Sequence, residues 1–310
     1  MGDLNHILQR LQESLGPLSG EPAALDGGIT NRNYRVTLGA REYVVRLPGK
    51  DTDLLGIDRE AERIANTAAA ELGIAPAVAL ALEECLVTDF IACASVSEGE
   101  VADGVEELAA ALRAFHDSPT SLPTRFWVPD LLADYAEIVH RRGGTLPDAY
   151  EHVVSVAKQI EAALPLTDPR PCHDDLLPGN IIRADADGRL MIVDWEYAGM
   201  GDPRFDLGNL AVNNDLDEAA EGRLLAAYHG AAPSDSQRAA LKLMRVLSDA
   251  REGAWGVVQA HVSELDFDFH GYAAEHFERL RTAVEHADHA ELIIIASQSN
   301  REDTSRAQTP

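Results

Sequence analysis

Residues 171–194, PCHDDLLPGNIIRADADGRLMIVD, constrain the fold of this chain more than any other stretch. His173, Asp175 and Asn180 follow one another in the order H-x-D-x-x-x-x-N. Two short apolar strand patterns joined by a turn then lead to Asp194. Because a hairpin returns the chain to the point where it began, this pattern predicts that Asp194 lies beside the other three side chains.

The residue types of this segment suit phosphoryl transfer, which needs a carboxylate for a hydroxyl proton and oxygen ligands for magnesium. We expect Asp175 to be the catalytic base, since its spacing to Asn180 favours it over the neighbouring Asp174. Asn180 and Asp194 are the expected Mg²⁺ ligands, and His173 is expected to be a structural hydrogen-bonding residue. Taken singly, each polar residue could simply cap a turn or a helix, so the combination carries the prediction.

Composition limits the classes of partner. The chain has 310 residues, enough for one two-lobed domain or two ordinary domains. Its formal net charge of −26 argues against nucleic acids and anionic membranes as partners. The acidity fits either a solubility or salt adaptation of the surface, or an electrostatic field that attracts a cationic substrate.

Targeting signals and cysteines indicate the compartment. No apolar run is long enough to span a membrane, and residues 1–16 have the spacing of an amphipathic helix, unlike a signal peptide. The three cysteines lack metal-ligand spacing. We therefore expect buried, reduced thiols in a cytoplasmic protein.

Strand and helix patterns divide the chain into a small α+β lobe at residues 1–92 and a mostly helical lobe at 93–296. The polar tail at 297–310 is expected to be disordered. The expected elements are a helix at 1–16, strands at 33–38 and 42–47, a helix at 58–72, strands at 77–82, 85–91, 180–183 and 190–193, and helices at 234–265 and 271–296.

The first hairpin carries candidate phosphate-binding residues. The glycine-containing segment with Gly28, Thr30 and Asn31 precedes it, and glycine lets backbone N–H groups approach a phosphate closely. Arg46, in an otherwise apolar strand, can hold phosphate with two parallel hydrogen bonds, and Glu62 is its expected ion-pair partner. The alternatives are an ordinary loop and a surface salt bridge.

One helix face carries candidate groups for binding an amine. Glu252, Trp255 and Gln259 are spaced so that they share this face. Trp255 could offer a π surface to an alkylammonium group and Glu252 a carboxylate, with Tyr197 and Tyr272 completing the box. The alternative is that these aromatic residues belong to the hydrophobic core.

Several motifs, in their order along the chain, resemble choline/ethanolamine kinases over roughly residues 20–285. They are GGITNRNYRV, VVRLPG, IDREAE, CHDDLLPGN, IVDWEYAGMGDPRFDLGNL and EGAWGVVQAHVSELDFDFHGYAAEHFERL. That family belongs, with the aminoglycoside phosphotransferases, to the protein-kinase-like fold. The resemblance therefore implies an α+β, bilobal protein-kinase-like fold, with an antiparallel sheet in the N-terminal lobe and a larger, mostly helical C-terminal lobe.

The resemblance also implies roles for single residues. It implies that Asp175 is the base, that Asn180 and Asp194 bind Mg²⁺, and that Arg46 with Glu62 contacts the ATP phosphates. The adenine would lie at residues 88–92, with contacts from Asp89 and Ile91. The resemblance places Tyr197, Trp255 and Tyr272 around the substrate's ammonium group. Glu196, Glu252 and Gln259 are further residues that we expect to contact the substrate.

Three positions depart from the pattern of eukaryotic members. Glu252 stands where these members carry an aromatic residue, and Leu177 and Asn213 stand where they tend to use polar or acidic contacts. The box is therefore less aromatic and richer in carboxylates than theirs.

Together these features predict an ATP- and Mg²⁺-dependent kinase that phosphorylates the hydroxyl of a small cationic amino alcohol, with choline or ethanolamine as the leading substrate. An aminoglycoside-type antibiotic phosphotransferase and a nucleotide-binding, pseudokinase-like module are the alternatives. The identity of the acceptor, the choice between ATP and GTP, and a homodimeric state are left open.

Overall fold

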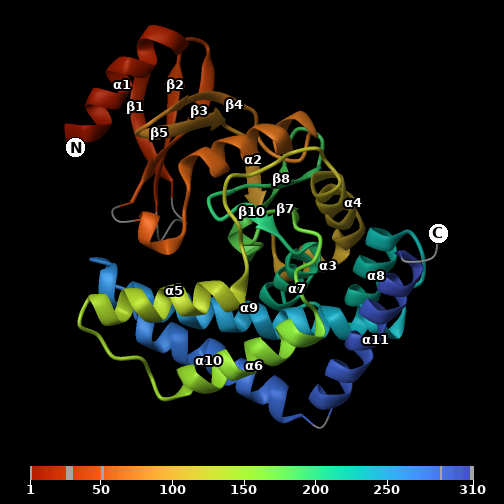
Figure 1. Ribbon diagram of the computed structural model, residues 1–310. Coiled ribbons are helices and arrows are strands. Elements are labelled where there is room, and N and C mark those ends of the chain that lie inside the picture. The colour runs from red at the N-terminus through yellow and green to blue at the C-terminus, as the bar shows by residue number, and fades with distance from the viewer. Residues whose placement is uncertain (1, 26–30, 50–51, 287, 308–310) are drawn as a thin grey trace.

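The computed structural model describes residues 2–25, 31–49, 52–286 and 288–307, which form a sheet-containing part and a larger helical part (Figure 1). The sheet is antiparallel, with its strands in the order β1-β2-β3-β5-β4. This architecture confirms the predicted α+β fold class. The strands of the sheet are β1 (Leu18–Leu25), β2 (Asn31–Leu38), β3 (Arg41–Pro48), β4 (Val78–Leu82) and β5 (Cys85–Asp89).

The hairpin of β2 and β3 confirms the first predicted strand pair. Gly39 forms its turn with a φ of 61°, a conformation that glycine adopts without steric cost. Val45 and Leu47 belong to the buried cluster under helix α1 (Gly2–Leu15). Because neighbouring side chains of a strand point to opposite faces, Arg46 points away from α1.

Helix α2 (Arg59–Glu71) confirms the helix predicted at 58–72 and lies between the sheet and the helical part (Figure 1). Asp58 caps it by accepting hydrogen bonds from the backbone N–H groups of Glu60 and Ala61, at 2.8 and 2.9 Å. Beyond its end, Gly73 has a φ of 77°, which closes the helix.

The connection between β3 and α2 packs into the helical part. It contains the short 3₁₀ helix η1 (Thr52–Leu55). Leu55 and Ile57 belong to the same buried cluster as Trp127 and Tyr135. The Tyr135 hydroxyl also donates a hydrogen bond to the carbonyl oxygen of Leu55, at 3.1 Å. These contacts fix the sheet relative to the helices.

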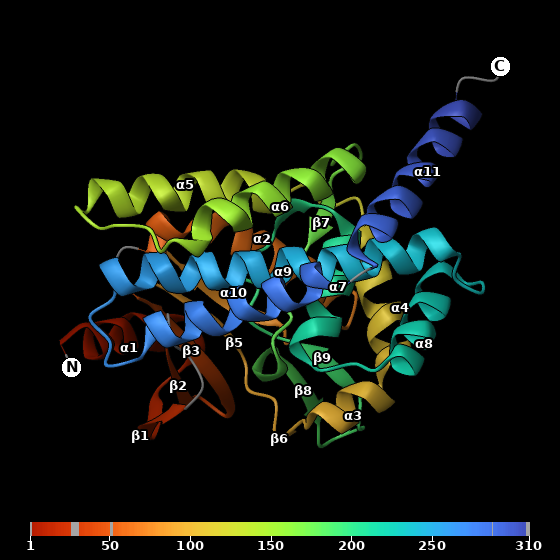
Figure 2. The ribbon, with the colours of Figure 1, turned by 90° about the horizontal axis from the view of Figure 1, so that it is seen from below.

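Helix α9 (Asp235–Val262) runs through the middle of the helical part, with α5, α6, α7, α10 and α11 packed around it (Figures 1 and 2). It confirms the helix predicted at 234–265, and Ser234 and Gln237 form a capping box at its start. No helix in the described ranges combines the length and apolarity needed to cross a bilayer. The other helices are α3 (Glu98–Asp103), α4 (Val105–His116), α5 (Val128–Arg141), α6 (Ala149–Ala163), α7 (Pro203–Asn213), α8 (Glu218–His229), α10 (Phe269–Glu285) and α11 (His289–Ala307).

Two small sheets carry the H-x-D-x-x-x-x-N segment. Strands β8 and β9 form the predicted second hairpin, and β6, which the sequence did not predict, pairs with the other edge of β8. Strand β7, just before this segment, pairs with β10, which follows it further along the chain. The bounds are β6 (Cys93–Ser95), β7 (Arg170–Cys172), β8 (Ile181–Ala184), β9 (Leu190–Ile192) and β10 (Gly199–Gly201), with the short 3₁₀ helix η2 (Pro178–Asn180) before β8.

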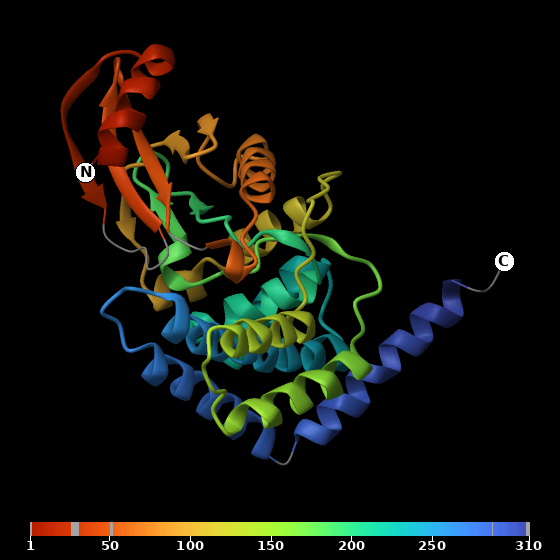
Figure 3. The same cartoon turned by 60° about the vertical axis from the view of Figure 1, so that its left-hand side comes forward.

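The C-terminal region differs from the expectation. The single helix predicted at 271–296 is wrong, because α10 ends before His286, whose backbone is extended. The chain then turns so that α11 packs on α9 and α6. Helix α11 continues through residues expected to be disordered, and its end projects from the body (Figures 2 and 3). Once its packed first half has formed, each further helical residue costs little.

The cysteines follow the expectation in part. All three are free, and Cys85 and Cys172 are buried. Burial raises the pKa of the Cys85 thiol to about 11, so it stays protonated at neutral pH. The prediction of a buried thiol is wrong for Cys93, which lies exposed on β6, where pairing leaves one side of the strand open.

Gly208 in α7 provides a test of the close packing between α7 and α9. A Cβ at this position would lie 2.5 Å from Cβ of Met244 and 2.7 Å from the carbonyl carbon of that residue. We expect Gly208→Ala to lower the free energy of unfolding by about 1–3 kcal/mol, measured by urea denaturation, because backbone atoms cannot move aside easily.

Gly222 in α8 is the matched control. The atom nearest to its added Cβ is Nη1 of Arg238, at 3.4 Å, at the end of a flexible side chain. Gly222→Ala should leave stability unchanged or raise it by up to about 1 kcal/mol, since alanine favours a helix interior. Equal stability of the two variants would contradict the packing argument.

Candidate active site

The backbone of the H-x-D-x-x-x-x-N segment is held by Asp206 of α7, which is completely buried. Its carboxylate accepts hydrogen bonds from the backbone N–H groups of His173 and Asp174, both at 2.8 Å, and contacts Nε2 of His116 at 2.9 Å. Burial acts to raise the pKa of Asp206, but its contacts with His116 and His173 outweigh that effect and hold it below its ordinary value. Asp206 therefore stays charged and fixes the loop that carries Asp175.

Two further contacts hold the same loop. Oδ1 of Asn209, one turn after Asp206 on α7, accepts a hydrogen bond from the backbone N–H of Leu176. The amide nitrogen of Asn214 donates to the carbonyl oxygen of Leu176 at 3.1 Å. The loop on either side of Asp175 is therefore clamped to α7.

The backbone is strained at two carboxylates. Asp174 has a φ of 67° and Asp194 a φ of 65°, in the left-handed region that non-glycine residues seldom adopt. Such strain persists only where surrounding contacts enforce it, and it is concentrated at functional sites. Here it turns the chain sharply at two points, just before Asp175 and two residues after the end of β9.

His173 has a structural role, as predicted. Its Nδ1 accepts a hydrogen bond from the backbone N–H of Asp175 at 3.2 Å, so Nε2 carries the proton that is donated to the carbonyl oxygen of Val193, at 3.0 Å. Burial lowers the pKa of His173 to about 4, against the charge of Asp206. The neutral ring thus joins the segment that follows β7 to the segment that follows β9.

Asp175 is held from within its own segment and from α9. Its Oδ2 accepts a hydrogen bond from the side-chain amide of Asn180 at 3.0 Å, and its Oδ1 accepts one from Nη1 of Arg251 at 3.0 Å. Burial raises the pKa of Asp175 to about 8; Arg251 opposes this shift, while the charges of Glu252 and Asp194 add to it. The carboxylate is therefore oriented and more basic than an ordinary aspartate.

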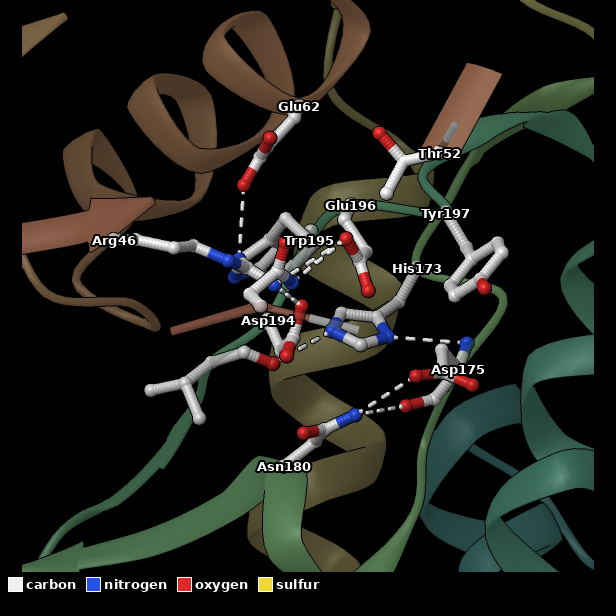
Figure 4. A network of polar contacts seen from close by, with 12 residues as sticks. Arg46, Thr52, Glu62, His173, Asp175, Asn180, Asp194, Trp195, Glu196 and Tyr197 are labelled. Atoms are coloured by element: carbon white, nitrogen blue, oxygen red, sulfur yellow. Dashed lines mark hydrogen bonds and ion pairs between the residues drawn. The ribbon is translucent and has the colours of Figure 1, made fainter. Parts of the chain in front are cut away.

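Asn180 and Asp194 have the donor set that Mg²⁺ prefers, one amide oxygen and one carboxylate. The amide nitrogen of Asn180 donates to the backbone oxygen of Asp175 at 2.8 Å as well as to its carboxylate. This orientation places the amide oxygen on the side away from Asp175 (Figure 4). The residues present therefore fit a divalent cation.

Arg46 and Glu62 form the ion pair that the sequence predicts. Nη1 of Arg46 donates to Glu62 at 2.8 Å, and Nη2 donates to Asp194 and lies 3.6 Å from Glu196 (Figure 4). Burial favours the neutral form of Arg46, but the charges of Asp194, Glu62 and Glu196 outweigh burial and raise its pKa. A permanent cation thus lies beside a candidate metal ligand.

Glu196 lies on the Arg46 side of the site. It accepts a hydrogen bond from the side-chain amide of Asn31 at 2.8 Å, and Nη1 of Arg59 contacts it at 3.3 Å. Arg59 also donates to Glu62 at 2.8 Å and to Thr52 at 2.9 Å. These contacts connect α2 to the segment after β9, whereas the sequence placed Glu196 among the amine-binding residues.

The candidate amine-binding residues form a second cluster around α9. The Tyr272 hydroxyl donates to Oε2 of Glu252 at 2.7 Å, and the indole N–H of Trp255 donates to the Tyr197 hydroxyl at 2.8 Å. Nη1 of Arg251 donates to Oε1 of Glu252 at 2.6 Å, and its Cζ lies 4.2 Å from the centroid of the Tyr197 ring. The structure thus brings Tyr197, Glu252, Trp255 and Tyr272 together.

Other predicted residues lie apart from these clusters or outside the described residues. Gln259 is buried on α9, one turn beyond Trp255. Asp89 at the end of β5 forms an ion pair with Arg41 at 2.7 Å, and Ile91 follows it in the connection to β6. Gly28 and Thr30 lie outside the residues that the structure describes.

Sequence reasoning missed Asp206, Arg59 and Arg251. Arg251 carried a weak signal, because an arginine interrupts an apolar helix and sits four residues before Trp255, on the same face. Asp206 carried none, since its role depends on partners more than thirty residues away along the chain.

The chain is similar in sequence and structure to known phosphotransferases. The phosphotransferase enzyme family matches residues 22–241. Probable choline kinase 1 of Arabidopsis thaliana is 25% identical over 89% of this chain and 92% of its own length. The solved choline/ethanolamine kinase family protein of Mesorhizobium loti is 28% identical, with a TM-score of 0.77 and coverage of 96% of this chain and 99% of its own. The solved complex of LicA with AMP is 25% identical, with a TM-score of 0.73 and coverage of 90% and 97%.

These similarities confirm three predictions from the sequence, namely the resemblance to choline/ethanolamine kinases, the protein-kinase-like fold and the phosphotransferase class. The nucleotide complex of LicA is consistent with the prediction of a nucleotide-binding protein. Because the family match covers well over half of the 310 residues, this protein belongs to the phosphotransferase enzyme family.

Proposed function

We propose that this protein transfers the γ-phosphoryl group of ATP, with Mg²⁺, to the hydroxyl of a small cationic amino alcohol, choline or ethanolamine. One observation carries the proposal. Asp175, Asn180 and Asp194 lie in one site. The side-chain amide of Asn180 donates a hydrogen bond to Asp175, and the guanidinium of Arg46 donates one to Asp194. This set supplies a base, metal ligands and a phosphate-binding cation, which together are the parts that phosphoryl transfer requires.

We assign metal binding to the Asn180 amide oxygen and the Asp194 carboxylate. Bound there, Mg²⁺ would neutralise the negative charge of the phosphate oxygens. Arg46 would hold the phosphates, because its guanidinium is permanently charged and offers paired donors. Glu62, bonded to Arg46 at 2.8 Å, positions that guanidinium from α2.

We assign nucleotide binding to residues 1–92 and acceptor binding mainly to 93–296. The glycine-containing segment with Gly28, Thr30 and Asn31 remains the predicted phosphate loop. Asn31 at its end is buried and bonded to Glu196, beside Arg46. Adenine contacts at Asp89 and Ile91 remain predictions.

Asp175 orients the acceptor hydroxyl and takes its proton as the hydroxyl oxygen forms a bond to the terminal phosphorus. The bond from that phosphorus to the bridging oxygen breaks, and its electron pair leaves with ADP. Because the transition state is loose, the proton moves late and an aspartate is a sufficient base. Asn180 and Arg251 hold the two carboxylate oxygens of Asp175 in place.

An amino alcohol is supported by the cluster around α9, where carboxylates and aromatic residues lie next to Asp175. Two similar proteins that span most of this chain are named as a probable choline kinase and as a choline/ethanolamine kinase family protein, which favours these acceptors over aminoglycosides. The intact set of Asp175, Asn180 and Asp194 argues against a module that binds a nucleotide without catalysis.

Asp175→Asn tests the base assignment. We expect kcat to fall by about 10²–10⁴-fold in a coupled ADP-release assay, since the amide cannot accept the hydroxyl proton. Affinity for MgATP, measured by calorimetry, should change little. Asp185→Asn is the control, because Asp185 lies exposed in the turn between β8 and β9 and should keep full turnover. Normal turnover of Asp175→Asn would refute the assignment.

The raised pKa of Asp175 predicts the pH dependence. With this pKa at about 8 in the free enzyme, kcat/KM should rise with pH as Asp175 loses its proton and then level off. Glu252→Gln removes a negative charge that raises this pKa, so the rise should move to lower pH. Kinetics from roughly pH 6 to pH 10 measure the shift.

Glu278 on α10 is the control for this shift. It lies exposed and pairs with Arg281, so Glu278→Gln should leave the profile in place. A rise in kcat/KM that stays at the same pH in Glu252→Gln would show that Glu252 does not act on the base.

A further inference from the structure

An arginine is built into the cluster that the proposed function assigns to the substrate's ammonium group. Arg251 is only 2% exposed, and its guanidinium lies 4.2 Å from the centre of the Tyr197 ring. The same group donates to Oδ1 of Asp175 and Oε1 of Glu252, at 3.0 and 2.6 Å. The protein therefore supplies its own cation to one aromatic ring and to both carboxylates.

Trp255 on α9 is also engaged. The N–H of Trp255 is bonded to the Tyr197 hydroxyl at 2.8 Å. Its ring packs edge-on against Phe269 and Tyr272, with centroids 5.8 and 5.7 Å apart, and the side chain is 6% exposed. A quaternary ammonium group has no N–H donors, so it relies on open aromatic faces. The rings of Tyr197 and Trp255 are already covered.

The carboxylate of Glu252 can still accept hydrogen bonds from a bound substrate. A carboxylate offers about four lone-pair sites, and the described contacts of Glu252 are one bond from Arg251 and one from the Tyr272 hydroxyl. Tyr272 is half-buried, and Glu252, to which it is hydrogen-bonded, is buried. A primary ammonium group can donate to the Glu252 carboxylate and the Tyr272 oxygen, and a trimethylammonium group cannot.

The charges of Asp175, Arg251 and Glu252 also favour a primary over a quaternary ammonium group. When Asp175 is ionised, as the base must be, Asp175 and Glu252 carry two negative charges and Arg251 one positive charge, so the three side chains together are matched by one ammonium group. Close to the arginine, a cation must be held by short, directional hydrogen bonds, because diffuse attraction is weakened by the neighbouring guanidinium.

We propose that Arg251 makes this site selective for an acceptor with a primary ammonium group, such as ethanolamine, over one with a quaternary ammonium group, such as choline. This inference rests on the proposed function, in which the acceptor lies between Asp175 and α9. Arg251 covers the face of the Tyr197 ring that a quaternary ammonium group would need. Glu252 can still accept hydrogen bonds from the N–H groups of a primary amine.

The wild-type enzyme tests the proposal without any variant. kcat/KM is measured with MgATP for ethanolamine, its N-methyl and N,N-dimethyl derivatives, and choline. We expect a decrease with each methyl group, and at least about 100-fold between ethanolamine and choline, because each step removes a donor and adds bulk. Equal use of the two substrates, or a preference for choline, would overturn the inference and leave the proposed function intact.

Arg251→Met then tests the residue itself. Turnover should fall for every acceptor, since Asp175 loses a partner, but the preference for ethanolamine should shrink at least about tenfold as the Tyr197 face opens. Arg251→Lys keeps the charge and should keep most of the preference. A folded, MgATP-binding Arg251→Met variant with an unchanged preference would overturn the role of Arg251.

Arg245→Met is the matched control. Arg245 lies on the same helix and pairs with Glu221, away from Asp175, so its loss should leave the preference unchanged. If the wild-type enzyme uses neither ethanolamine nor choline but phosphorylates another alcohol, the proposed acceptor class is wrong. Use of neither amine would thus overturn the proposed acceptor class, whereas equal use of both amines would overturn only the inference about Arg251.

Discussion

The burial of several carboxylates in one place is the constraint on which this site depends. An uncompensated buried charge costs several kcal/mol, so each of these groups needs a cation or hydrogen-bond donors. Arg46, Arg59 and Arg251 provide the cations, from β3, α2 and α9. The carboxylates with which they form ion pairs are Glu62, Asp175, Asp194, Glu196 and Glu252.

These ion pairs also join the two parts of the molecule. Arg46 extends from the sheet to Asp194, which follows β9 in the other part, and Arg59 extends from α2 to Glu196. Removing one partner would leave a buried charge unpaired, which is far more costly than losing an exposed salt bridge. In the proposed reaction, phosphates and metal enter a network in which three arginines face five carboxylates.

Much of the fold and part of the site could be predicted locally. The hairpins, the cap of α2 and the pairing of Arg46 with Glu62 follow from short-range patterns, because strand period, capping chemistry and helix spacing act over a few residues. The break between α10 and α11 could not be predicted, since it depends on how α11 packs on α9 and α6. The position of Glu196 likewise depends on Asn31 and Arg59, far away along the chain.

The sequence alone determined which chemical groups are present and the local elements that carry them, including two carboxylates and an amide around one hairpin. Tertiary structure alone decided which charged and polar side chains come into contact. Arg251 and Asp175 are 76 positions apart, and Asp206 and His173 are 33 apart, yet each pair is in direct contact. Local propensities act over a few residues, whereas the pairing of buried charges is set by which helices pack together.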